Sequence, residues 1–272
     1  MTFPLPHLLS VSRIATVLAL AVCAAAGGSA RAAEAPAAHG VQARTTATHD
    51  LAGLVIVLDP GHNGGNGSHP SQINRQVFIG NRYKACDTAG TSTNDGYPEH
   101  AFTWDVAQRV KRLLVARGAD VRLTHPDDHG VGPCITQRAQ LGNRAHAVVA
   151  LSIHADGGPA SGHGFHVIRP SRIVGLTDDI FSASRVLATQ LRNHLRDDAH
   201  VATSTYIGLR GIDVRGDLGG LNMSNVPKCF VELGNMRNAA EARNLRRASY
   251  RQQLARVLAS TLGDYAKAHA PA

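Results

Sequence analysis

The stretch Leu54-Val55-Ile56-Val57-Leu58-Asp59-Pro60-Gly61-His62 decides the fold of this 272-residue chain. Its five apolar residues, mostly β-branched, are typical of a strand that is buried on both faces. Pro60 and Gly61 end the strand abruptly. In open α/β sheets, ligands bind at the carboxyl ends of the strands. We therefore expect His62 to lie at a binding edge of the sheet.

Two further apolar runs repeat this pattern. One leads into His154 and the other leads into Glu232. Shorter strand candidates cover residues 120–124 and 164–168. Amphipathic helical periodicity is found over residues 102–114, 135–146, 179–196, 239–245 and 250–266. The alternation predicts one α/β domain, with a twisted, mostly parallel central sheet and helices on both faces. Residues 200–226 are rich in glycine and predict no defined element.

The amino-terminal residues have the pattern of an export signal. Arg13 precedes an apolar run over residues 14–26, and Ala30-Arg31-Ala32 resembles a signal-peptidase site. We therefore predict a signal peptide at 1–32, a flexible segment at 33–50 and a catalytic domain at 51–268. The protein is then expected in the periplasm, the cell wall or the extracellular space, with no permanent membrane span.

The composition indicates a basic protein that is packed mainly by aliphatic residues. The formal net charge is +8, and aromatic residues make up 4% of the chain. The basic residues are scattered and not interleaved with aromatic ones, which argues against nucleic acid as a partner. Export favours a disulfide, and three cysteines beyond the signal peptide allow three pairings. The pair Cys86–Cys134 is favoured because both lie in loop sequence, whereas Cys229 lies in a strand.

Three chemically useful side chains follow these strands. If the strands are parallel neighbours, His62, His154 and Glu232 meet at one edge of the sheet. Two histidines and one carboxylate form the ligand set of a hydrolytic zinc site. A second glutamate, Glu99, lies at the start of a helix. Spacing alone leaves open which glutamate binds metal, although a rigid strand end suits a base better.

Simpler interpretations apply to each residue taken alone. A histidine at a strand end is commonly a hydrogen-bonded capping residue, and Glu99 could be a solvated acid that favours the helix dipole. His163 and His166 are interpreted as surface or core residues. A serine hydrolase is disfavoured because no Gly-x-Ser-x-Gly elbow occurs. The glycine-rich sequence after His62 lacks the lysine of a phosphate-binding loop.

Three motifs together resemble one enzyme family. They are Val57-Leu58-Asp59-Pro60-Gly61-His62-Asn63-Gly64-Gly65, Leu151-Ser152-Ile153-His154-Ala155-Asp156, and Val231-Glu232-Leu233-Gly234-Asn235 with Asn238. In this order they resemble the zinc-dependent N-acetylmuramoyl-L-alanine amidases of the amidase-3 type. The resemblance runs from about residue 54 to residue 265.

The resemblance implies one Zn²⁺ per chain, with His62, Glu99 and His154 as ligands and Glu232 as the catalytic carboxylate. Substrate-binding candidates are Arg138, which is similar to a recurrent arginine of the family, and Asn63. The implied reaction is hydrolysis of the amide between the lactyl group of N-acetylmuramic acid and L-alanine of the stem peptide. The implied partner is peptidoglycan or a muropeptide fragment, bound by a monomer.

Two other functions are compatible with the sequence. A zinc carboxypeptidase or endopeptidase would cut within stem peptides, and a wall-binding module would not catalyse at all. Residues 66–98 form a longer and more polar segment than the family pattern suggests. We expect this segment to form a wall of the substrate site. Residues 161–179 leave little room for an inhibitory helix, so an unplugged, single-domain enzyme is expected.

Overall fold

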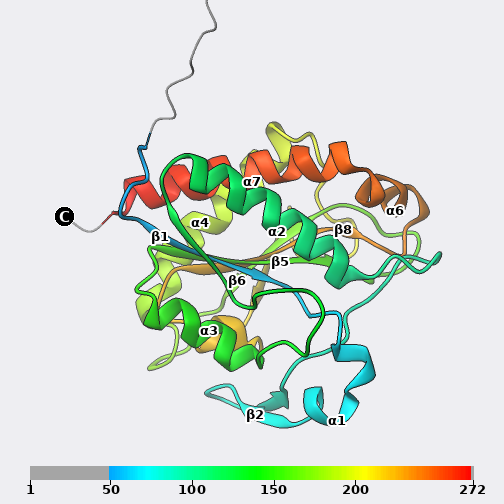
Figure 1. Ribbon diagram of the computed structural model, residues 1–272, viewed down its shortest axis with the longest axis horizontal. Coiled ribbons are helices and arrows are strands. Elements are labelled where there is room, and N and C mark those ends of the chain that lie inside the picture. The colour runs from blue at the N-terminus through cyan, green and yellow to red at the C-terminus, as the bar shows by residue number, and fades with distance from the viewer. Residues whose placement is uncertain (1–48, 271–272) are drawn as a thin grey trace, which may run out of the picture. The chain divides into compact units, whose positions relative to one another are not determined.

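The computed structural model describes residues 49–270. The predicted signal peptide and nearly all of the predicted flexible segment lie outside these residues. The described chain contains a six-stranded sheet with the strand order β4-β1-β5-β8-β6-β7 (Figure 1). The strands are β1 (Val55–Pro60), β4 (Asp120–Leu123), β5 (Val149–Asp156), β6 (His166–Pro170), β7 (Ile212–Arg215) and β8 (Lys228–Asn235).

The central strands are parallel, as the sequence predicted. β1 pairs in parallel with β4 and β5, and β5 pairs in parallel with β8. β6 runs antiparallel to β8, so the sheet is mixed rather than uniform. The three strands that carry the proposed site are therefore neighbours, with β5 in the middle.

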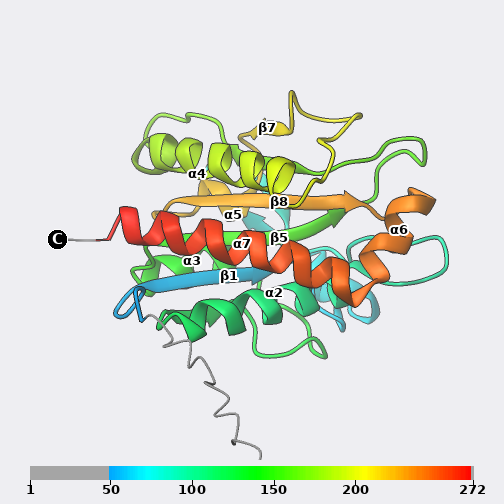
Figure 2. The same cartoon turned by 90° about the horizontal axis from the view of Figure 1, so that it is seen from above.

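Helices cover both faces of the sheet (Figures 1 and 2). One face carries the long helices α2 (Glu99–Ala116), α4 (Asp178–Asp197) and α7 (Ala248–Ala268), and α6 (Ala239–Arg246) connects β8 to α7. The other face carries the shorter helices α3 (Ile135–Arg144) and α5 (Gly219–Asn222). β7 and α5 lie in the glycine-rich region where the sequence predicted no element.

The two faces of the sheet differ in polarity because side chains alternate along each strand. On β5, Leu151 and Ile153 point into the large apolar core beneath the three long helices. Ser152 and His154 alternate with them and point to the opposite face, where the apolar cluster is small. The smaller helices therefore leave room for polar side chains beside the carboxyl ends of the strands.

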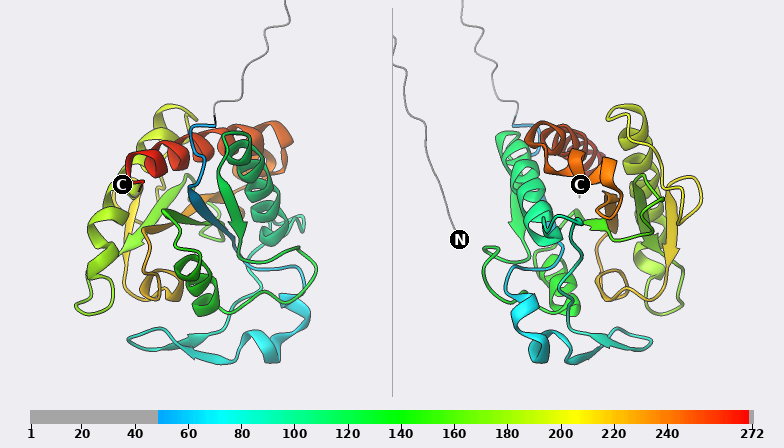
Figure 3. Two further views of the ribbon diagram at one scale, coloured as in Figure 1. Left: turned by 60° about the vertical axis from the view of Figure 1, so that its left-hand side comes forward. Right: turned by 90° about the vertical axis from the view of Figure 1, so that its right-hand side faces the viewer.

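The segment between β1 and α2 has its own small structure (Figures 1 and 3). It contains η1 (Asn66–Ser68), α1 (Pro70–Ile73) and a hairpin formed by β2 (Gln76–Phe78) and β3 (Tyr83–Ala85). A disulfide joins Cys86 to Cys134 and ties this segment to the start of α3, which confirms the favoured pairing. Cys229 is buried and unpaired within residues 49–270. No helix in the same range is long and apolar enough to cross a membrane.

Candidate metal centre

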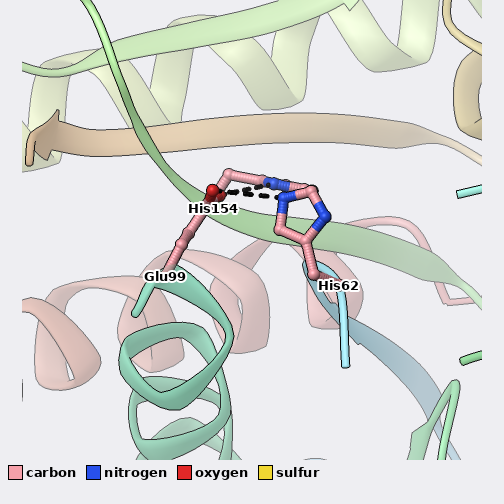
Figure 4. A group of neighbouring side chains, drawn as sticks. All are labelled: His62, Glu99 and His154. Atoms are coloured by element: carbon pink, nitrogen blue, oxygen red, sulfur yellow. Dashed lines mark hydrogen bonds and ion pairs between the residues drawn. The ribbon is translucent and has the colours of Figure 1, made fainter. Parts of the chain in front are cut away.

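The three predicted ligands meet just past the end of β1 and beside the last residues of β5 (Figure 4). His62 Nε2 lies 3.2 Å from Glu99 Oε2, and His154 Nδ1 lies 3.0 Å from Glu99 Oε1. One ligand atom from each of the three residues lies within 4.8 Å of the other two. The carboxylate of Glu99 therefore faces two imidazoles, which confirms that these side chains are neighbours.

The local backbone explains how the ligands converge. His62 follows β1 with φ at 65°, a left-handed conformation that costs a side-chain-bearing residue about 1–3 kcal/mol. The preceding Gly61 packs against the ring of His154, and a Cβ at this position would lie 2.2 Å from Cε1 of that ring. Glu99 is the first residue of α2 and is almost fully buried. The absence of a side chain at Gly61 therefore lets the ring of His154 lie beside His62 and Glu99.

Electrostatics strongly couple the three side chains. Burial alone would lower the pKa of His62, but the charges of Glu99 and Asp87 raise it to about 10. Burial alone would raise the pKa of Glu99, but His62 and His154 bring it well below its ordinary value. The buried negative charge of Glu99 is consequently stabilised by positive charge beside it. Two imidazole nitrogens and one carboxylate oxygen are a donor set that fits Zn²⁺ and leaves a position for water.

Glu232 is the next polar group along this edge of the sheet. In the register of β5 and β8 it lies directly opposite His154. Its Oε2 is buried and has no hydrogen-bond partner among residues 49–270. Burial, and then the negative charges of Glu99 and Asp156, raise the pKa of Glu232 well above its ordinary value. Glu232 is therefore a buried carboxyl group beside the three ligands whose surroundings favour its protonated form.

Comparison with known proteins places this geometry in a family. The family model for amidase-3, N-acetylmuramoyl-L-alanine amidase, matches residues 56–263. The chain belongs to the amidase-3 family. Its hydrolytic class and its mixed α/β fold both follow from that membership.

Relatives at higher identity support the assignment. The chain is 40% identical to an N-acetylmuramoyl-L-alanine amidase of Mycobacterium tuberculosis over 213 residues, which are 77% of this chain and 85% of the relative. The crystal structure of an N-acetylmuramyl-L-alanine amidase from Mycobacterium smegmatis matches with a TM-score of 0.75 at 37% identity, covering 80% of this chain and 99% of that one. The corresponding apo enzyme from Mycobacterium abscessus matches with a TM-score of 0.74 at 40% identity, covering 79% and 99%.

The amidase-3 site opens into a cleft on the polar face of the sheet. His62, His154 and Glu232 line one end of this cleft. Its other walls come from the β2–β3 hairpin, α3, α5 and the strands β6 and β8. The segment after β1 therefore contributes a wall of the cleft, as the sequence predicted.

The two substrate-binding candidates are both buried. Arg138 is 4% exposed, and its guanidinium donates to the carboxylates of Asp59 and Asp87 and to the carbonyl oxygens of Pro60 and His62. Asn63 is 3% exposed, and its Oδ1 accepts from the backbone N–H of Gly64. These bonds give Arg138 a clear role in holding the end of β1. Contact of either residue with substrate stays a prediction.

Sequence analysis missed a buried ionic cluster behind the amidase-3 site. Lys228 is 1% exposed, and its Nζ lies 3.0 Å from Oδ2 of Asp59, which also accepts from Ser152. The sequence did contain a signal for this cluster, because Lys228 lies in an apolar strand and shares a strand face with Glu232. Sequence analysis also missed Asp87, whose position could not be predicted from a turn-rich segment. His166 is 1% exposed and pairs in register with Glu232, so its interpretation as a core residue agrees with its burial.

Proposed function

We propose that this chain hydrolyses the amide between the lactyl group of N-acetylmuramic acid and L-alanine of the peptidoglycan stem peptide, with one Zn²⁺ bound by His62, Glu99 and His154. One observation carries the proposal. In a domain of the amidase-3 family, a buried carboxylate faces two histidines, and beside them lies a second carboxyl group, one oxygen of which has no hydrogen-bond partner within residues 49–270. The second carboxyl group is Glu232, which we propose as the catalytic residue.

The proposed chemistry divides between the ligands and Glu232. When bound, Zn²⁺ supplies Lewis acidity that lowers the pKa of a water molecule to about 7 and polarises a carbonyl oxygen. Glu232 takes the proton from the attacking water and later gives it to the leaving amine of L-alanine. Its raised pKa suits this role, because the carboxyl group must gain and lose a proton within one cycle. Its place on the rigid strand β8 suits a group that must be held in position.

The cleft supports a peptide-bearing substrate. Its lining combines apolar side chains, such as Ile168 and Phe230, with the charged side chains of Lys84, Arg215 and Asp217. A stem peptide carries both aliphatic and charged groups, so this lining suits such a chain. Gly219 and Gly220 add backbone without side chains on the α5 side.

The remaining features of the proposal concern the whole protein. We propose that residues 51–268 form the catalytic domain and that residues 1–32 are a signal peptide which directs export to the periplasm or beyond. The partner is peptidoglycan or a muropeptide fragment, with no role for nucleic acid, and the enzyme acts as a monomer. The disulfide between Cys86 and Cys134 is compatible with an oxidising location.

Product analysis tests the proposed bond specificity. Purified muropeptides are digested with the enzyme, with and without a zinc chelator, and the products are identified by mass spectrometry. An amidase yields disaccharides that have lost whole stem peptides, together with free peptides that begin with L-alanine. Shortened peptides still attached to muramic acid would instead identify a peptidase. Binding without any product would identify a wall-binding module.

A further inference from the structure

One short segment surrounds the rear nitrogen of the ligand His62. Nδ1 of His62 lies 3.0 Å from the carbonyl oxygen of Thr88 and 3.1 Å from its hydroxyl. Oδ1 of Asp87 lies 3.5 Å from the same nitrogen. A nitrogen that faces several acceptors carries the ring proton. When Nδ1 keeps its proton, Nε2, the nitrogen that faces Glu99, is the one that would bind a metal ion.

The same segment is fixed to the backbone of His62 through Arg138. One guanidinium nitrogen of Arg138 donates to Asp87 Oδ2 at 2.8 Å and to the carbonyl oxygen of His62 at 3.0 Å. Asp87 and Arg138 are 5% and 4% exposed. Because water is excluded, this ion pair holds its geometry more firmly than a surface pair would. Arg138 therefore holds both the side chain of Asp87 and the backbone of His62 in place.

A covalent bond supports this arrangement from the other side. Cys86 immediately precedes Asp87, and its disulfide partner Cys134 is the residue at the amino-terminal cap of α3. The backbone N–H of Ile135 also donates to the carbonyl oxygen of Cys86 at 2.7 Å. Arg138 lies one turn further along α3. The disulfide therefore joins the two segments whose side chains form the Asp87–Arg138 pair.

We propose that Asp87 is a positioning residue for the metal centre, which holds His62 with its proton on Nδ1 so that Nε2 is free to bind Zn²⁺. Arg138 and the disulfide keep Asp87 in place. This inference rests on the zinc site proposed above. Histidine ligands commonly donate their second ring N–H to a carboxylate or carbonyl oxygen, and loss of that acceptor weakens metal binding about 10–100-fold. The segment from Cys86 to Thr88 thus supports the metal centre as well as bounding the cleft.

Zinc affinity tests the inference without measuring activity. Asp87→Asn keeps the size of the side chain and removes its charge. We expect its dissociation constant for Zn²⁺, measured by competition with a chromophoric chelator, to rise about 10–100-fold. The matched control is Asp105→Asn, which removes a carboxylate held by Arg109 and Arg251 on the helical face. The control should bind Zn²⁺ as tightly as the wild type does.

Each result has one interpretation. Wild-type affinity in a folded Asp87→Asn variant would overturn the positioning role. Failure of the wild type itself to bind Zn²⁺ would instead overturn the proposed zinc site. Circular dichroism establishes whether the variant is folded before its affinity is measured.

A second measurement needs no variant and applies even if Asp87→Asn does not fold. Nitrogen-15 NMR of histidine-labelled, zinc-loaded wild type reports which ring nitrogen carries the proton. We expect the proton of His62 on Nδ1. His154 provides an internal contrast, because its Nδ1 lies on the Glu99 side and would bind the metal, which leaves the ring proton on Nε2. A proton on Nε2 of His62 would overturn the proposal.

Discussion

Replacement of Lys228 by methionine should destabilise the domain strongly. Nζ of Lys228 lies 3.0 Å from Asp59 and is surrounded by protein. Although burial opposes ionisation, Lys228 and Arg138 hold the pKa of Asp59 well below its ordinary value. Arg138 is shared with Asp87. Without Lys228, two buried carboxylates would therefore face a single guanidinium.

The expected loss follows from that uncompensated charge. Removing one partner of a buried ion pair typically costs about 3–5 kcal/mol of the free energy of unfolding. For a domain of this size each kcal/mol lowers Tm by about 2–4 °C, so the expected drop is roughly 6–20 °C. Denaturant and thermal unfolding should be compared with the wild type at saturating Zn²⁺ and with the disulfide intact. These conditions keep ligand binding from masking the effect.

A double-mutant cycle separates this charge effect from lost packing. Asp59→Asn combined with Lys228→Met removes one charge of each sign, so Arg138 and Asp87 remain balanced. The double variant should therefore be more stable than the sum of the two single losses predicts. Additivity within about 0.5 kcal/mol, or a loss below about 1 kcal/mol for Lys228→Met alone, would refute the reasoning.

Three further predictions concern packing, acid stability and thiol reactivity. Gly61→Ala should displace the ring of His154 and lower zinc affinity in a chelator competition, whereas Gly130→Ala, where a Cβ meets nothing within 4 Å, should not. The pKa of Asp59 is lowered in the folded state, so its contribution to stability is present above the ordinary carboxyl pKa of about 4 and is lost as the pH falls below it. Unfolding measured against pH should therefore show a free energy of unfolding that falls at acid pH. Burial raises the pKa of the Cys229 thiol, so iodoacetamide should label this residue only after unfolding, as peptide mass spectrometry can determine; labelling in the native state would contradict its burial.

Much of the site could be predicted because three of the proposed site residues follow or end a continuous apolar strand. The runs that lead to His62, His154 and Glu232 contain enough β-branched and aliphatic residues to be recognised as buried strands. Parallel neighbours place their carboxyl ends together, so proximity followed from topology. The place of Glu99 could not be predicted in this way, because helix α2 begins at Glu99 whereas its apolar periodicity begins only at residue 102. Its ligand role came from the family resemblance.

The parts that could not be predicted depend on partners far apart in the sequence. The edge strand β7 is only four residues long and partly exposed, so its residues show no clear alternation. Lys228 is visible in an apolar strand, but its partner Asp59 is 169 positions away. Asp87 lies in turn-rich sequence that has no periodicity. Its relation to His62 becomes visible only when the disulfide and Arg138 bring the two segments together.

The central claim is that Glu232 moves protons beside a zinc ion which it does not itself bind. The most direct measurement is the amide hydrolysis rate of Glu232→Gln, with zinc per chain determined on the same sample. We predict one zinc per chain and a rate lower by about 10²–10⁴-fold, the usual contribution of a positioned acid–base group. An unchanged rate at full zinc occupancy would contradict the account, as would loss of zinc from this variant.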